Sequence, residues 1–330
     1  MQDKNVPLPF WEAARREMEQ YHFLTDLRVQ PQWEIPKQIA IHVAVSGRAS
    51  EGIAGDEDGK YPQSINDFVE AASSVIAAGA TGVHIDFTFV VDKDGRRLDS
   101  GDVPMVDAYR MVLEPLRARF GDSFIANLNV LNGKTFDACL EPARAGLADA
   151  APCAAGHPDA FMIPAIRALE ECGVKPEIVV HSSGEIELAK RKLIDAGIAR
   201  KPLNWIVLFG LPFNCGRTLL SGVWVPGSRD LMQHLVLMLD QIREIDPESV
   251  ITVCAAGRAT LYLTTLATML GVNIRVGIED TVWRYPNSDE MFSSNLDMFT
   301  RALQIADLHG RRPMSATDYR KALGISRRKS

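Results

Sequence analysis

Long hydrophobic runs are missing from this 330-residue sequence. No stretch approaches the roughly 18 apolar residues that a membrane-spanning helix needs. Near the start of the chain, Glu12, Arg15, Arg16, Glu17 and Glu19 interrupt any apolar run of signal-peptide length. We therefore expect a soluble, cytoplasmic protein that has no membrane partner.

Cysteine is scarce, and basic residues are not in excess. The five cysteines lie far apart and form no C-x-x-C pair, which excludes a disulfide framework and a zinc ribbon. The 36 Lys and Arg residues face 42 Asp and Glu residues, so the net charge is −6 and nucleic acid is not the expected partner. The basic run at residues 327–329 is interpreted as a solvated tail.

Three common catalytic motifs are also absent. No strand is followed by G-x-G-x-x-G, and the glycines at 52, 55 and 59 lack the Gly-Lys-Ser/Thr ending of a phosphate loop. No G-x-S-x-G nucleophile elbow is present. The sequence therefore gives no support to a dinucleotide-binding sheet, a P-loop enzyme or a serine hydrolase.

Short apolar runs alternate with longer amphipathic segments from residue 38 onward, at a spacing of about thirty residues. This alternation is typical of successive βα units, and an eightfold repeat favours a closed (β/α)8 TIM barrel over an open doubly wound sheet. We predict one barrel domain over residues 38–330. The expected strands lie near 39–46, 82–87, 124–130, 148–153, 177–181, 203–208, 250–254 and 274–278, each followed by a helix.

Two helical segments lie outside this repeat. Residues 1–37 are predicted to form an N-terminal arm with a helix over 10–23, and a short C-terminal helix is predicted over 315–323. An aromatic arm of this kind usually covers a barrel end or a neighbouring subunit. We therefore expect a homo-oligomer.

Ionisable residues lie at the carboxyl ends of two expected strands, which in a barrel meet at one mouth. The second strand ends with His84 and Asp86, and the last is followed by Glu279 and Asp280, with Arg275 inside it. One imidazole and two or three carboxylates suit a divalent cation, and a remaining carboxylate can act as a base. A His–Asp hydrogen bond and a solvated strand end are the alternative interpretations.

Four ordered segments resemble one protein family: 78–84 (AGATGVH), 173–178 (GVKPEI), 256–258 (AGR) and, above all, 275–280 (RVGIED). They resemble the β-keto acid cleavage enzymes, and the similarity extends from about residue 39 to residue 325. The resemblance implies a zinc-dependent (β/α)8 barrel. It also implies a reaction in which a β-keto acid and acetyl-CoA give acetoacetate and a new CoA thioester.

The resemblance also implies the roles of individual residues. The metal would be bound by His84, Asp86 and Glu279. Asp86 stands where the family has a second histidine, so the site would be harder and more anionic than usual. The catalytic residues would be Asp280 as base, Arg275 as the partner of the substrate and of the transition-state charge, and Glu177 as an assisting carboxylate.

Three further residues are candidates for substrate binding: Ser46, Arg48 and Asn129. Arg48 stands where the family commonly has an acid that meets an amino group, so an aminated substrate is not expected. Arg48 favours an anionic or polar substrate tail, and an ion pair with Glu51 or Asp56 is the alternative. Two other functions stay open: a metal-dependent aldol or Claisen lyase that does not use CoA, and a noncatalytic ligand-binding barrel.

Overall fold

The structure is a computed structural model, and it describes residues 8–20, 33–46, 62, 64–87, 103–132, 135–210 and 228–326. The chain divides into two compact units, Met1–Ile35 and Pro36–Ser330. The first contains helix α1 (Leu8–Gln20), which begins before the predicted arm helix; residues 21–23 of that prediction lie outside the described residues. No helix in the described ranges is long and apolar enough to cross a membrane.

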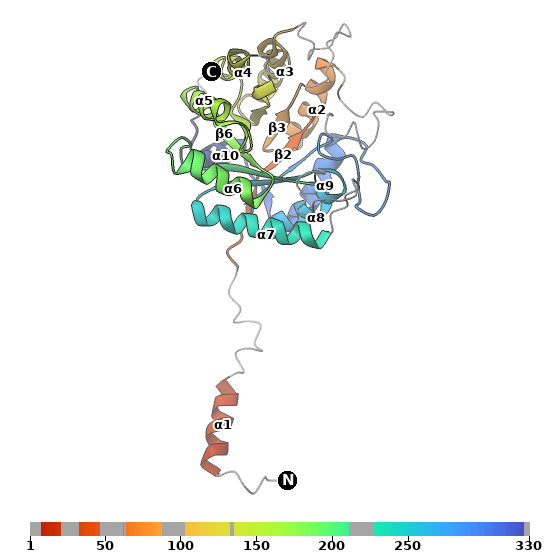
Figure 1. The fold of residues 1–330 in the computed structure, drawn as a ribbon. Helices are drawn as coiled ribbons and strands as arrows, with labels where there is room; N and C mark the ends of the chain where they lie inside the picture. Colours follow the sequence, from red (N-terminus) through yellow and green to blue (C-terminus); the bar gives the residue numbers. More distant parts are fainter. Residues whose placement is uncertain are drawn as a thin grey trace, which may run out of the picture. The chain divides into compact units, whose positions relative to one another are not determined.

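The second unit is a closed barrel of parallel strands in sequential order, which confirms the predicted (β/α)8 fold (Figure 1). Each strand pairs with the next, and the last pairs with the first. The strands are β2 (Ile41–Ala44), β3 (Gly82–Ile85), β4 (Ile125–Leu128), β5 (Ala150–Ala154), β6 (Lys175–Val180), β7 (Asn204–Phe209), β8 (Val250–Ala255) and β9 (Asn273–Val276).

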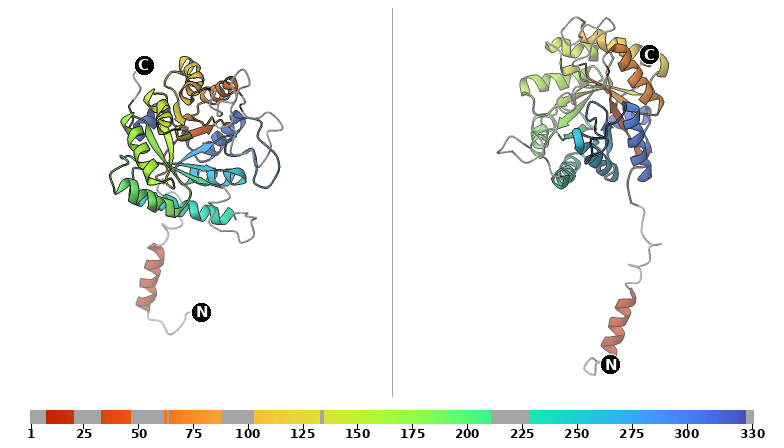
Figure 2. Two further views of the ribbon diagram at one scale, coloured as in Figure 1. Left: turned by 45° about the horizontal axis from the view of Figure 1, so that its top comes forward. Right: turned by 90° about the vertical axis from the view of Figure 1, so that its right-hand side faces the viewer.

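Helices surround the barrel, as the two further views in Figure 2 show. They are α2 (Ile65–Ala77), α3 (Met105–Phe120), α4 (Phe136–Arg144), α5 (Asp159–Glu171), α6 (Ser183–Ala189), α7 (Ser228–Ile245), α8 (Thr260–Met269) and α9 (Asn295–Leu308). Local sequence explains where several of them begin. At α2 the Ser64 hydroxyl accepts from the Asp67 amide while the Asp67 carboxylate accepts from the Ser64 amide, a reciprocal capping box.

The amino-terminal end of the barrel is closed by the chain's last helix, α10 (Ala316–Leu323). Its Tyr319 and Leu323 are buried in one cluster with Ile125 and Val250 of the barrel strands. β10 (Arg312–Pro313), which lies between α9 and α10 in the chain, pairs in parallel with β1 (Gln38–Ile39), which precedes β2. The opposite end, where the strands reach their carboxyl termini, is therefore the end available for a site.

Strand alternation separates two kinds of side chain. Val45, Val83 and Ile85 belong to the main hydrophobic core with the helices, so their neighbours Ser46 and His84 point into the barrel. The helices thus hold the strands through the apolar residues of one face. The other face is left free for polar side chains at the mouth.

Candidate active site

A chain of hydrogen bonds crosses the barrel interior from β3 to β6. His84 Nδ1 lies 2.9 Å from Asn127 Oδ1, and Asn127 Nδ2 donates to Glu177 Oε2 at 2.9 Å. All three side chains are buried. The Asn127 side chain reaches from β4 past β5 to Glu177 on β6. It can do so because the inward residues of β5, Ala150 and Pro152, have no long side chain between the two strands.

This series of hydrogen bonds determines which ring nitrogen of His84 carries the proton. Asn127 donates its amide NH2 to Glu177, whose pKa is raised by burial, and so turns its oxygen toward His84. His84 must then donate from Nδ1, which leaves a lone pair on Nε2. Burial, followed by the positive charge of Arg275, lowers the pKa of His84 to about 4, so the ring is neutral at pH 7.

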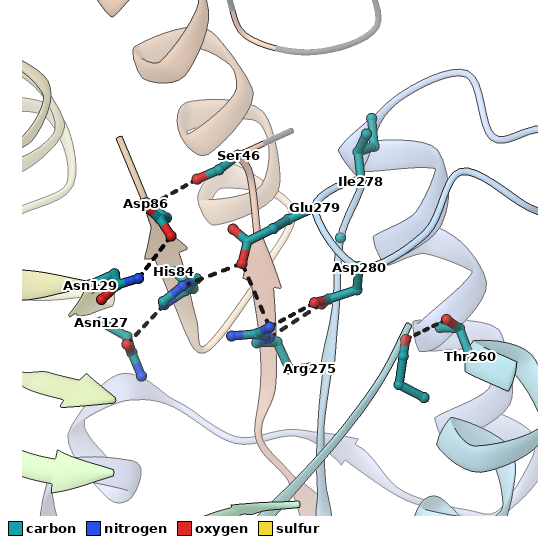
Figure 3. A network of polar contacts seen from close by, with 12 residues as sticks. Ser46, His84, Asp86, Asn127, Asn129, Thr260, Arg275, Ile278, Glu279 and Asp280 are labelled. Carbon is teal, nitrogen blue, oxygen red and sulfur yellow. Dashed lines mark hydrogen bonds and ion pairs between the residues drawn. The ribbon is translucent and has the colours of Figure 1, made fainter. Parts of the chain in front are cut away.

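Glu279 lies between His84 and Arg275 (Figure 3). Its Oε1 is 3.5 Å from His84 Nε2 and 3.7 Å from Arg275 Nη2. Burial raises the pKa of Glu279 well above its usual range; Arg275 opposes this shift, and the carboxylates of Asp280 and Asp86 add to it. Oε2 is buried and finds no hydrogen-bond partner within the described residues.

Arg275 and Asp280 form a bidentate ion pair. Arg275 Nη2 donates to Asp280 Oδ1 at 2.6 Å and Nε donates to Oδ2 at 3.2 Å, and both side chains are buried. The turn between them depends on Gly277, whose φ is 153° and where a Cβ would lie 2.0 Å from the Ala44 carbonyl oxygen. Only glycine lets the chain after β9 pass so close to β2 and bring Glu279 and Asp280 inward.

Asp86 is held beside this cluster by neighbouring groups. Its amide donates to Ser46 Oγ at 2.7 Å, and Asn129 Nδ2 donates to its Oδ2 at 2.8 Å. The Tyr109 hydroxyl donates to the Asn129 carbonyl at 2.9 Å and so steadies that residue. Ser46, Asp86 and Asn129, predicted from different strands, thus meet, and the predicted substrate contacts Ser46 and Asn129 both contact Asp86.

The residues around His84 offer a partial fit to a metal ion. Two acceptors, His84 Nε2 and Glu279 Oε1, face each other, and Glu279 Oε2 has no partner; a cation or a proton is the natural bridge between them. The third predicted ligand, Asp86, is held by Asn129 instead. Across the described ranges, no group of three or more His, Cys, Asp or Glu residues is close enough to hold an ion.

Other predicted residues have different outcomes. Arg48 lies outside the described residues, as do Glu51 and Asp56. His42 on β2 is buried, and within the described part of the chain neither of its ring nitrogens has a hydrogen-bond partner. His181 pairs with Glu185 at 3.0 Å.

Sequence reasoning did not identify Asn127 or Tyr109 as part of the site. Strand alternation contained the signal for the asparagine, because Asn127 precedes Asn129 by two residues and therefore shares its inward face. Tyr109 comes from α3 (Met105–Phe120), and its hydroxyl reaches two backbone carbonyls at the strand ends, those of Ile85 and Asn129. No local pattern predicts such a contact, because it depends on how the helix packs.

A closed barrel that gathers ionisable side chains at the carboxyl ends of its strands defines a TIM-barrel enzyme. The family model for beta-keto acid cleavage enzymes matches residues 38–325, so the chain belongs to this family, and the resemblance found in the sequence is confirmed. The roles of the individual residues stay predictions.

Two curated relatives carry the name 3-keto-5-aminohexanoate cleavage enzyme. The protein from Acetoanaerobium sticklandii is 24% identical over 302 residues, which is 88% of this chain and 100% of the relative. The protein from Fusobacterium nucleatum is also 24% identical over 302 residues, covering 88% and 99% of the two chains. The similarity thus covers nearly the full length of both relatives.

Solved structures share the fold at lower identity. A ternary complex of ObcA with C4-CoA adduct and oxalate is 17% identical, with a TM-score of 0.61 over 81% of this chain and 68% of that one. Type I 3-dehydroquinate dehydratase from Clostridium difficile is 12% identical, with a TM-score of 0.52 over 85% of this chain and 98% of that one. Both support the barrel architecture.

Proposed function

We propose that this enzyme cleaves a β-keto acid by exchange with acetyl-CoA, releasing acetoacetate and a new CoA thioester. Beyond family membership, the observation that carries the proposal is the convergence of His84, Glu279, Arg275 and Asp280 at one point of the barrel mouth. A neutral imidazole, a buried carboxyl and an arginine–carboxylate pair are the groups that enolate chemistry needs.

The proposed reaction balances without an oxidant or reductant. A β-keto acid R–CO–CH2–COO⁻ loses a proton from its central carbon to Asp280, and that carbon forms a bond with the acetyl carbonyl of acetyl-CoA. The CoA thiolate leaves and attacks the R–CO carbonyl, which breaks the old carbon–carbon bond. The proton returns from Asp280 to acetoacetate, and R–CO–SCoA is the second product.

Arg275 has two roles in this scheme. It orients the Asp280 carboxylate through both oxygens, which leaves the remaining lone pairs of Asp280 for the substrate proton. Although burial opposes it, the negative charge of Asp280 raises the pKa of Arg275 further above its already high value, so its charge is permanent. That charge stabilises negative charge that develops on the substrate.

A divalent metal, with zinc expected, belongs to the same proposal. His84 and Glu279 would hold it, and Asp86 would complete the set once its carboxylate turns away from Asn129. Such an ion acts as a Lewis acid on the keto oxygen. Asn127 and Glu177 contribute by keeping the Nε2 lone pair of His84 directed at the ion.

Acetyl-CoA as co-substrate has further support from the ObcA complex, in which a similar barrel holds a CoA adduct. The names of the curated relatives point to an aminated β-keto acid. The segment after the first strand of this chain, residues 46–49 (SGRA), offers no acid to an amino group, so we propose a substrate without one. We further propose a homo-oligomer that works in the cytoplasm.

An acetyl-transfer assay tests the proposal directly. The metal-loaded enzyme is incubated with a panel of β-keto acids and acetyl-CoA labelled in the acetyl group. We expect labelled acetoacetate and an unlabelled new thioester in equal amounts. Cleavage that proceeds without acetyl-CoA would instead indicate another aldol or Claisen lyase. Saturable binding of the keto acids with no product would indicate a ligand-binding barrel.

A further inference from the structure

The barrel mouth has a second, apolar half that the proposed chemistry does not use. Ala154, Val179, Ile206, Leu208 and Cys254 form a hydrophobic cluster separate from the main core, and we call these five residues the apolar wall. They lie on β5, β6, β7 and β8. Apart from Glu177 on β6, the polar residues of the site come from the ends of β2, β3 and β4 and from the segment from β9 onward.

The register of the strands places this wall at the mouth. Ala154 pairs with Val179, and Val179 pairs with Ile206. Leu208 pairs with Cys254. Ala154 is the last residue of β5, and the inward residues Val179, Leu208 and Cys254 are each one residue from a carboxyl terminus. The wall therefore lies at the catalytic end of the barrel.

The wall is continuous with the proposed reaction centre. Val179 follows Glu177 by two residues on the same face of β6. Cys254 comes two residues after Thr252, which pairs with Asn273, so Cys254 lies level with Arg275 in the next strand. The charges of Arg275 and Asp280 both act on the Cys254 thiol. A molecule bound by Arg275 would therefore contact the apolar wall on the side of the barrel where β8 lies.

Two residues of the wall are partly exposed and can therefore contact a ligand. Cys254 is fully buried and Ile206 is 2% exposed. Ala154 and Leu208, the last inward-facing residues of β5 and β7, are only partly buried. Ala154 and Cys254 are small. If this layer of side chains served only to fill the barrel interior, large branched residues would be expected at these positions.

We propose that the apolar wall receives the tail of the β-keto acid, so that the preferred substrates carry an unbranched aliphatic tail. This inference rests on the proposed function: the carboxylate and keto groups lie at the polar half, and the carbon chain extends over β5 to β8. The prediction of an anionic or polar tail from Arg48 is the competing hypothesis. The two hypotheses differ in their preferred substrate, and one panel decides between them.

The test is a series of β-keto acids with acetyl-CoA: 3-oxopentanoate, 3-oxohexanoate and 3-oxooctanoate, with 3-oxohexanedioate as the anionic match to 3-oxohexanoate. If the tail lies on the wall, kcat/KM should rise about fourfold for each added methylene until the wall is covered. The dicarboxylate should be the poorer of the matched pair. A flat series, or a preference for the dicarboxylate, would overturn the inference.

Variants connect the chain-length dependence to the wall. Leu208→Ala should flatten the rise, and the near-isosteric Val179→Thr should do so with little change in volume. Val207→Ala is the matched control, because Val207 is buried in the main core on the opposite face of β7. Val207→Ala should keep the parental increase of kcat/KM with tail length. An equal flattening in the control and the wall variants would mean that the wall does not contact the tail.

A binding measurement separates failure of the inference from failure of the proposed function. Pentanoate, hexanoate and octanoate cannot react, so calorimetric titration of the same enzyme reports tail burial without turnover. Affinity that rises with length in an enzyme without acetyl-transfer activity would support the wall and reject the reaction. Acetyl transfer with a flat series in both assays would reject the wall alone, and flat binding without activity would reject both.

Discussion

At the residue scale, the site depends on which atoms have a lone pair free to accept a proton. Asp280 has both oxygens paired with Arg275, yet each carboxylate oxygen retains a second lone pair. Arg275 cannot lose its proton at any working pH, so the carboxylate is the member of the pair that can accept one. Asp280 is therefore the proposed base rather than Glu279, whose Oε1 faces His84.

Replacing the proposed base should separate catalysis from folding. Asp280→Asn keeps the shape of the side chain but cannot accept the proton, so kcat should fall by about 10²-fold or more while bound metal stays unchanged. Steady-state kinetics and elemental analysis give the two values. Asp289→Asn, at an exposed carboxylate that pairs with Arg258, is the matched control and should keep parental kinetics. An Asp280→Asn enzyme within a few-fold of the parent would assign the base elsewhere.

His42 makes stability depend on pH. Burial, followed by the charges of Arg275 and His84, lowers its pKa from 6.5 to about 3. The folded protein therefore keeps the ring neutral while the unfolded chain takes up a proton below pH 6.5, so the stabilisation is lost as pH falls from about 6.5 to about 3. Between pH 7 and pH 5 this single group should lower the free energy of unfolding by about 2 kcal/mol.

Urea denaturation at the two pH values measures this effect. His84, whose pKa is lowered to about 4, adds a loss of the same sign, so a non-titrating variant is needed to isolate His42. His42→Gln should reduce the difference between pH 7 and pH 5 by about 2 kcal/mol. His309→Gln, at an exposed position, should leave the difference unchanged. An unchanged difference in His42→Gln would show that the ring is not held neutral.

At the element scale, α10 is held to the barrel by one buried arginine. Arg320 donates to the carbonyls of Asp122 at 2.7 Å and Phe124 at 2.6 Å, and it lies 3.4 Å from the buried carboxylate of Asp149. Asp149 in turn accepts from the Ala126 amide at the start of β4. The last helix and the first residues of β4 and β5 thus form one unit at the amino-terminal end of the barrel.

Removing this arginine should cost more stability than removing its neighbour. Arg320→Met leaves Asp149 and two carbonyls without their donor in a buried site, so the free energy of unfolding should fall by about 3 kcal/mol. Arg117 also contacts Asp149, at 3.6 Å, but is partly exposed, and Arg117→Met should cost about 1 kcal/mol. Denaturant midpoints at pH 7 compare the two. Equal losses would mean that Arg320 contributes no more than a surface ion pair.

Most elements were predictable because each helix and strand carries its own local signal. Apolar periodicity and capping residues such as Ser64 and Ser315 identified α2 and α10 with their amino-terminal boundaries. The errors occur where tertiary packing decides. Apolar periodicity predicts one helix over residues 136–147, but α4 ends at Arg144. It also predicts a helix over 185–196, whereas α6 begins at Ser183, capped by Ser182, and is followed by a π-helix over Lys190–Ile194.

At the scale of the whole molecule, the sequence predicted which ionisable side chains meet at the barrel mouth but not how they pair. His84, Glu279, Arg275 and Asp280 were expected at one mouth, and they meet there. Asp86 was expected to join them, yet it contacts Asn129. Barrel closure brings strand ends together in a way that topology alone specifies, whereas each hydrogen bond depends on side-chain lengths and on the space that neighbouring strands leave.

The last prediction concerns the coupling of metal binding to the stability of the whole barrel. An ion that binds only the folded state at 100 times its dissociation constant adds about 2.7 kcal/mol. For a domain of this size that corresponds to a melting temperature about 4 °C higher. Calorimetry of the chelator-treated enzyme, with and without added zinc, should show this rise. His84→Ala should abolish it because the ion loses its nitrogen ligand.

Asn127→Leu tests the orientation of His84 more directly than His84→Ala does, because it keeps the nitrogen ligand. Leucine fills the same space but neither accepts from His84 Nδ1 nor donates to Glu177, so the Nε2 lone pair is no longer held toward Glu279. Loss of such an orienting hydrogen bond typically weakens metal binding by 10- to 100-fold. At a fixed zinc concentration the rise in melting temperature should therefore shrink to about half or less. A full rise in Asn127→Leu would show that the chain from Glu177 to His84 does not orient a metal ligand.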